Sequence, residues 1–111
     1  MPNWCSNIVV FKGTPEKLRE VKKLFANLIL LGKAEDSGQL PEFIIEEEGY
    51  FFELWMIANI ITYETRWSPN TEIIKKVADR FGLDFIHEYA EPMNGVHGKV
   101  YYTDGELQIS K

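Results

Sequence analysis

The stretch ITYETRWSPNTEIIKKVADRFGLDFIHEYAE, residues 61–91, decides the fold, because it reads as strand, helix and strand with few residues between them. Every second residue from Tyr63 to Trp67 is of a type that favours strands, as in a half-buried strand. Ser68 and Pro69 then mark a helix start, since a serine hydroxyl can accept from an unpaired amide and proline needs no amide donor there. The first half of the stretch therefore predicts a strand that leads directly into a helix.

The second half of the stretch has the spacing of a helix that is followed by another strand. Its apolar residues recur three and four positions apart, and Gly82 ends the pattern. From Phe85 to Tyr89 the composition is again that of a strand. Residues 61–91 thus predict one compact β-α-β unit, whose helix is built on Ile73, Ile74, Val77, Ala78 and Phe81.

The N-terminal part repeats this theme. Residues 3–12 form a strand candidate in which residues 8–11 are apolar at both alternating sets of positions, which predicts a central strand that is covered on two sides. Thr14 and Pro15 form the same kind of helix start as before, and we expect the helix to run to about Leu31 and to end at Gly32.

The middle of the chain is less regular. Residues 33–42 have loop composition, and we expect a strand over about 50–56, a turn near residues 58–59 and a strand over 60–67. The run LWMIANII could also be helical, because periodicity alone does not separate short apolar runs.

The element order β-α-β-β-α-β predicts an α+β fold of the split β-α-β, or ferredoxin-like, kind: an antiparallel sheet with both helices on one face. A strand around 99–103, a turn at Asp104 and Gly105, and a short strand to Ser110 predict a C-terminal β-hairpin that extends the sheet. The length of 111 residues suits a single domain over residues 1–111.

Composition and charge exclude several classes of protein. No apolar run approaches the roughly 18 residues of a membrane span, and the N-terminus lacks a secretory signal. We therefore expect a cytoplasmic protein that does not associate with a membrane. Cys5 is the only cysteine, which excludes an internal disulfide. The net charge is −5, and residues 34–64 contain eight acids and no lysine or arginine.

Three motifs carry a resemblance to a known family: the opening MPNWCSN, the junction TRWSPN, and HEYAEPMNGVHGKV with its Tyr-x-Glu-Pro and Gly-x-x-Gly. Together they resemble the YubB ferredoxin-like domain family, small proteins of unassigned function that are associated with phages and conjugative elements. The resemblance covers about residues 1–30 and 60–100. It implies a ferredoxin-like topology and a mobile-element context, whereas the cysteine spacing that an iron–sulfur cluster requires is absent.

Candidate chemical sites are few. His87, Glu88, Glu91 and His97 have metal-ligand types, but neighbours on a strand point to opposite faces, and we expect no metal. Glu91 before Pro92 is expected to end the strand and to bond nearby backbone or a tyrosine.

Two groups of residues offer catalytic residue types. Cys5 with His87 or His97 could pair as nucleophile and base, although a small buried thiol is the commoner case, and the acids of residues 46–48 alternate faces. We therefore expect no enzyme and no required cofactor.

The remaining candidate is a surface. In the first strand Ile8 and Val10 lie on one side and Val9 and Phe11 on the other, and helices can cover only one. We expect an aromatic-rich set on the face away from the helices, partly covered by residues 34–49, by the C-terminal hairpin or by a second copy of the chain. This candidate interaction surface consists of Trp4, Phe11, Tyr63, Trp67, Phe85, His87 and Tyr89.

We expect this surface to bind a protein partner of unknown identity, which could be a second copy of the chain in a homodimer. The alternative is single-stranded nucleic acid stacked on the open sheet face, as in RNA-recognition modules. The third strand lacks their Lys/Arg-Gly-Phe pattern and the net charge is negative, so nucleic acid is the less favoured partner.

Overall fold

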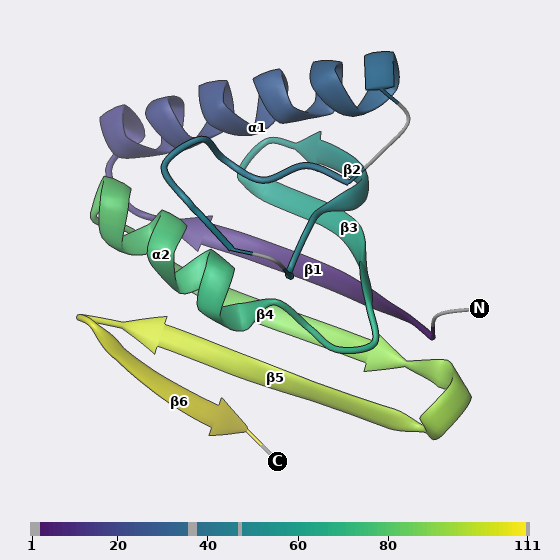
Figure 1. Cartoon of the computed structure of the whole chain (residues 1–111). Coiled ribbons are helices and arrows are strands. Elements are labelled where there is room, and N and C mark those ends of the chain that lie inside the picture. The colour runs from purple at the N-terminus through teal and green to yellow at the C-terminus, as the bar shows by residue number, and fades with distance from the viewer. Residues whose placement is uncertain (1–2, 36–37, 47, 111) are drawn as a thin grey trace.

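The computed structural model of the protein describes residues 3–35, 38–46 and 48–110 (Figure 1). It contains two helices, one short 3-10 turn and six strands: β1 (Trp4–Lys12), α1 (Pro15–Glu35), β2 (Phe52–Ile57), β3 (Ile60–Arg66), α2 (Thr71–Phe81), β4 (Asp84–Glu91), η1 (Pro92–Asn94), β5 (Val96–Thr103) and β6 (Glu106–Ser110). The predicted α+β element order is confirmed, and residues 52–57 form a strand rather than the alternative helix.

The six strands form one antiparallel sheet in the order β2-β3-β1-β4-β5-β6. The four strands β2, β3, β1 and β4 have the ferredoxin-like arrangement, and the β5–β6 hairpin extends the sheet beyond β4. Both helices lie on the same side of the sheet (Figure 1). The predicted fold class is therefore confirmed, with β1 in an interior position between β3 and β4.

Helix α1 begins as predicted and ends later than predicted. The hydroxyl of Thr14 accepts a hydrogen bond from the Lys17 amide at 3.3 Å, so Thr14 caps the helix before Pro15. The chain stays helical through Gly32 to Glu35. The predicted end at Leu31 was wrong because a glycine inside a helix costs only about 1 kcal/mol and does not by itself stop it.

Helix α2 begins at Thr71, two residues after Pro69, the predicted first residue. The chain bends at Trp67 and Ser68, where the Ser68 amide donates to the Arg66 carbonyl at 2.8 Å, and the carbonyl of Asn70 accepts the first helical hydrogen bonds, from the Ile73 and Ile74 amides. The bend arises because Trp67 has a left-handed φ of 71°, which takes the chain out of β3 before the helix begins. The predicted end is confirmed, since Gly82 adopts a left-handed C-cap with φ 66°.

The core lies between the sheet and the helices. Phe25 of α1 is fully buried, and its ring lies 5.7 Å from that of Phe11 and 5.5 Å from that of Phe51. The described part of the segment between α1 and β2 packs on this same side, where Ile44 is also buried in the core. The expectation that residues 34–49 help to cover the other face is therefore wrong for the residues of that segment that the structure describes; Asp36, Ser37 and Glu47 lie outside them.

Helix α1 carries a buried residue, Phe25, and an exposed one, Leu30, and the two allow a matched test of this packing. We expect Phe25→Ala to lower the free energy of unfolding by about 3–5 kcal/mol, because it leaves a cavity next to the rings of Phe11 and Phe51. Leu30, on the same helix, is 65% exposed, and Leu30→Ala should change stability by no more than about 0.5 kcal/mol. Urea denaturation followed by circular dichroism measures both, and equal losses would contradict the described orientation of α1.

Candidate functional site

The strand register shows where the predicted interaction residues lie. Val9 is opposite His87 and Phe11 is opposite Phe85, so these residues share one face. Phe11, Phe85 and His87 are no more than 1% exposed and Tyr63 is 3% exposed, all of them beneath the helices. Four of the seven predicted surface residues are thus in the core. The prediction failed because the helices cover the aromatic set, which buries the larger apolar area.

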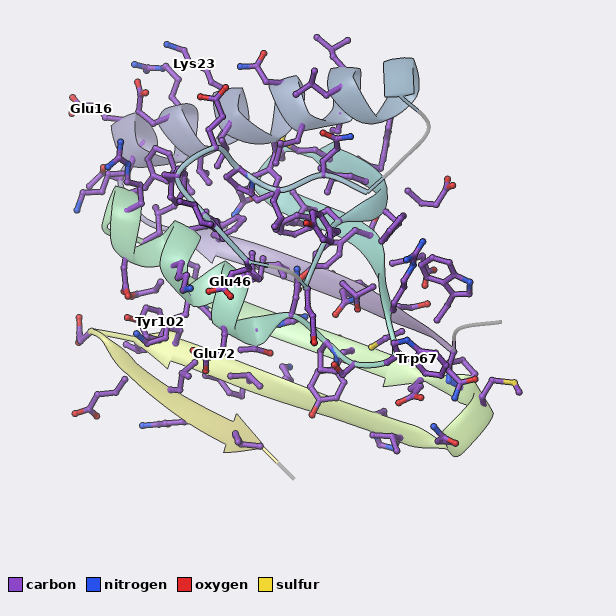
Figure 2. The ribbon with its side chains drawn as sticks, viewed as in Figure 1. Glu16, Lys23, Glu46, Trp67, Glu72 and Tyr102 are labelled. Carbon is purple, nitrogen blue, oxygen red and sulfur yellow. The ribbon has the colours of Figure 1, made fainter. Side chains whose placement is uncertain are left out.

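The other three predicted residues lie nearer to solvent but do not form one patch. Trp4 is 37% exposed on the face away from the helices. Trp67 is 58% exposed and lies beyond the end of β3, where the chain turns towards α2 (Figure 2). Tyr89 is half-buried on the helix side, where its ring covers Gly98 of β5 so closely that a Cβ at position 98 would lie 2.4 Å from its hydroxyl oxygen.

The face away from the helices, which we call the open face, carries the second alternating set. One continuous row of paired positions crosses five strands and is apolar or aromatic throughout. Neither the helices nor the described part of the α1–β2 segment covers it, and the β5–β6 hairpin extends the sheet rather than folding over it. We call it the apolar row; from β2 to β5 it consists of Ile57, Ile60, Val10, Ile86 and Tyr101.

Residues next to the apolar row add exposed apolar area. Ile8 is 45% exposed and Trp55 is 53% exposed, and both pair with Thr62 of β3 on the open face. Phe52 and Trp4 pack edge to face with their centroids 5.2 Å apart. Sequence reasoning identified the side of Ile8 and Val10 but missed Phe52 and Trp55, because the register of β2 contains a bulge between them.

The charged groups of the open face are mostly satisfied within the chain. The hydroxyl of Ser6 donates to Glu64 at 3.0 Å, and Lys99 forms a 3.1 Å ion pair with Glu88. Hydrogen bonds that the Lys99 ammonium donates to Tyr101 and Glu88 raise the pKa of Lys99 and so stabilise its positive charge.

Arg66 is a charged group of the open face that contacts aromatic rings instead of an acid. Its guanidinium lies 4.7 Å from the Phe52 ring centroid and 5.9 Å from that of Trp4, as in a cation–π contact. Within the described residues no carboxylate lies within ion-pair distance of it. Arg66 therefore offers a positive charge at one corner of an otherwise apolar surface.

A chain of hydrogen bonds lies beneath the other face, at the junction of β3 and α2. His87 Nε2 lies 2.8 Å from Asn7 Oδ1, and His87 Nδ1 lies 3.0 Å from the hydroxyl of Thr71. An amide oxygen can only accept, so Nε2 carries the proton and Nδ1 accepts from Thr71. The amide nitrogen of Asn7 in turn donates to Thr65 Oγ1 at 3.0 Å, and that hydroxyl donates to the Ser68 carbonyl at 2.7 Å.

A second branch fixes the residue before α2. The hydroxyl of Tyr63 donates to Asn70 Oδ1 at 2.6 Å, and Asn70 Nδ2 donates to the Gly49 carbonyl at 2.9 Å. Among the described residues no buried side-chain nitrogen or oxygen is left without a partner. The two branches together position the start of α2 against β1, β3 and β4.

Burial sets the protonation states in this region. It lowers the pKa of His87 to about 4, raises the pKa of Tyr63 well above 10, and raises the pKa of the Cys5 thiol. His87 is thus neutral at pH 7, and Cys5 is a protonated, buried thiol. The alternative of a Cys5–His87 pair does not form, because the imidazole is bonded to Asn7, Thr71 and Tyr63, and Cys5 is the small buried thiol that the sequence favours.

The metal candidates are also separated. His87 lies in the core, whereas His97 is exposed on β5. Glu91 accepts hydrogen bonds from Asn94 at 2.6 Å and from Asn3 at 3.4 Å, neither of which is the backbone or tyrosine partner that we predicted. No group of three potential ligands occurs within residues 3–35, 38–46 and 48–110. The described helices include none with the length and apolar character that crossing a membrane requires.

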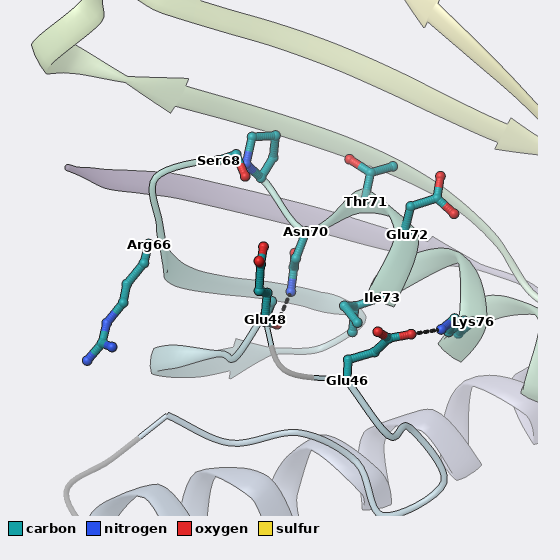
Figure 3. Close-up of a pocket in the computed structure, with 11 residues that line it drawn as sticks. Glu46, Glu48, Arg66, Ser68, Asn70, Thr71, Glu72, Ile73 and Lys76 are labelled. Atoms are coloured by element: carbon teal, nitrogen blue, oxygen red, sulfur yellow. Dashed lines mark hydrogen bonds and ion pairs between the residues drawn. The ribbon is translucent and has the colours of Figure 1, made fainter. Parts of the chain in front are cut away.

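A hollow of about 500 Å³ opens beside the start of α2 (Figure 3). Its walls carry Glu46, Glu48 and Glu72 as well as Arg66 and Lys76, and Lys76 is paired with Glu46. Arg66 extends away from this ion pair (Figure 3). The acids offset the cations, so the charge of the hollow does not favour an anionic ligand. Of the predicted acidic triplet, Glu47 lies outside the described residues.

Residues 47–110 match the family described as the ferredoxin-like domain in Api92-like protein. The chain belongs to this family. The match covers more than half of the chain, from the residues just before β2 to the end of β6, and so includes most of the open face. No curated protein and no solved structure matches the chain.

The protonation of His87 predicts a pH dependence of stability. Its pKa is about 4 in the folded protein and near 6.5 when exposed, so the unfolded chain binds the extra proton first as the pH falls. The stability contributed by the neutral His87 should therefore be fully present above pH 6.5 and should fall by roughly 3 kcal/mol between pH 6.5 and pH 4.

Urea denaturation at a series of pH values tests this expectation. His87→Gln should remove the part of the slope between pH 6.5 and pH 4 that comes from this group. An unchanged slope in His87→Gln would contradict the assignment of a neutral buried imidazole.

Proposed function

We propose that the protein is a non-catalytic interaction domain whose binding surface is the open face. The observation that carries the proposal is the uncovered apolar row, which crosses five strands between Ile57 and Tyr101. Exposed contiguous apolar surface on a folded domain marks an interaction site more often than a scattered set does. The buried arrangement of Cys5 and His87 supports the non-catalytic part of the proposal, since neither group is available to a substrate.

The proposed partner is another protein, and its contact element is an amphipathic helix. The apolar row offers aliphatic and aromatic side chains to the apolar side of such a helix, in the way that α1 and α2 pack on the opposite face. Arg66 would bind a carboxylate at the edge of the contact, because its guanidinium lies against the Phe52 ring and has no acidic ion-pair partner among the described residues.

The composition of the surface favours protein over nucleic acid. Lys99 is paired with Glu88, and Lys12 lies opposite Asp84 at the end of the sheet. Phosphate binding depends on several accessible cations, and here acids accompany the cations across the sheet. The second candidate, single-stranded nucleic acid stacked on the aromatic rings, is favoured only by the Trp4, Phe52 and Arg66 cluster.

The biological setting is part of the proposal. The resemblance to the YubB ferredoxin-like domain family, carried by MPNWCSN and TRWSPN, supports a role for the domain in a phage or conjugative element. A non-catalytic accessory domain suits that setting, because it would act by bringing a partner to the assembly that carries it.

Paired lysine substitutions test the surface. Ile57→Lys places a charge on the apolar row at a position that is 68% exposed, and Leu30→Lys makes the same change on α1 at 65% exposure. In affinity capture from the native host, after nuclease treatment, we expect the wild type and Leu30→Lys to retain the same partner. Ile57→Lys should reduce its recovery at least tenfold, because burying an unpaired ammonium costs several kcal/mol. Equal recovery by both variants would move the binding surface elsewhere.

The nucleic-acid candidate has its own test. We expect a fluorescein-labelled oligothymidylate to show no salt-dependent change in anisotropy with the wild-type protein near physiological ionic strength. Binding that weakens with added salt and is lost in Trp55→Ala would replace the protein partner by single-stranded nucleic acid on the same face.

A further inference from the structure

Strand β6 is an edge strand, and no described strand pairs with its outer side. It pairs with β5 alone, and Leu107 and Ile109 are 37% and 72% exposed. In Figure 1, α2 lies over β4 and β5 and does not reach β6. A β-strand at a sheet edge offers unpaired backbone amides and carbonyls to another strand, which native proteins usually prevent.

The β5–β6 turn determines which backbone groups face outward. Asp104 and Gly105 have φ of 50° and 81°, as in the two-residue hairpin turn with left-handed backbone at both positions. In such a hairpin the flanking pair, Thr103 with Glu106, exchanges both hydrogen bonds, and the bonded pairs then alternate. The amides and carbonyls of Leu107 and Ile109 therefore point away from β5.

The opposite edge of the sheet shows the protection that β6 lacks. Strand β2 has a bulge next to Glu53, whose φ is 51°, and the residue before β2 is bridged to Gln39 by two 2.9 Å backbone hydrogen bonds. These features interrupt a regular edge. Residues 106–110 contain no proline, lysine or bulge. The two edges are thus unequal, and the open one is regular.

We propose that β6 pairs antiparallel with β6 of a second copy of this chain, about a two-fold axis that passes beside Gln108. This register places Leu107 opposite Ile109 of the partner subunit, so all four outward backbone groups of each strand find partners. Gln108 then lies opposite its own copy, and a glutamine amide can both donate and accept. Glu106 lies opposite the uncharged residue 110, so no like charges face each other.

The dimer would join two six-stranded sheets into one continuous sheet. It would also bring the exposed side chains of Leu107 and Ile109 from both subunits together on the helix side, where they continue the row of Val100 and Tyr102. The open face is not part of this contact, so the inference does not depend on the proposed function.

Light scattering of the purified full chain tests the dimer. We expect a mass of about twice 12.9 kDa at high micromolar concentration, and dissociation to 12.9 kDa on dilution. Ile109→Pro removes one outward amide and leaves the β5 hydrogen bonds, and Ile109→Lys places a charge at the contact; both should give monomers. Ile57→Lys, at similar exposure on the opposite edge strand, is the matched control and should remain dimeric.

Amide hydrogen exchange gives a readout that does not depend on the variants. In the dimer the amides of Leu107 and Ile109 should exchange slowly, and their exchange should quicken on dilution while that of Gln108 changes little. A wild type that is monomeric at every concentration overturns the inference. A dimer that persists in Ile109→Pro also overturns it. A dimer that is lost in Ile57→Lys overturns it as well and would place the contact on the open face.

Discussion

The 2.8 Å hydrogen bond from His87 to Asn7 is the interaction on which the packing of this protein depends most. It joins β4 to β1 in the interior of the sheet, at a place where neither side chain reaches water. A buried polar group is costly unless it is bonded, so each of these residues requires the other. Because Asn7 also bonds Thr65 and His87 also bonds Thr71, the strand–helix junction is held by the same few atoms.

That dependence explains why the start of α2 needs no conventional cap. Asn70 directs its side chain into the interior, to Tyr63 and Gly49, and makes no capping hydrogen bond to the helix. The helix is therefore placed by tertiary contacts to β3 and to the segment before β2. Its C-terminal end, by contrast, is defined locally by the left-handed Gly82.

The sequence predicted the order and type of the elements well, because strong local patterns determine them: the helical spacing of α2, the Thr14-Pro15 start of α1 and the Asp104-Gly105 turn. It did not predict which alternating set of β1 faces the helices. Ile8 and Val10 are as apolar as Val9 and Phe11, so periodicity has no preference, and only the combined register with β3 and β4 decides. Four aromatic or histidine residues were therefore assigned to the surface although they form the core. The hydrogen bonds of His87 could not be predicted from local patterns either, since they join residues up to 80 positions apart.

The close fit between Tyr89 and Gly98 has a consequence for the evolution of this family. The tyrosine ring occupies the space in which any side chain at position 98 would begin, so the two positions are coupled by volume rather than by chemistry. A relative that acquires a side chain at the position of Gly98 must first shorten or redirect the residue at the position of Tyr89, and the reverse order of changes is blocked. The second glycine of Gly-x-x-Gly is thus constrained by the large ring on the neighbouring strand, and a side chain at its position requires that the ring be absent or turned away.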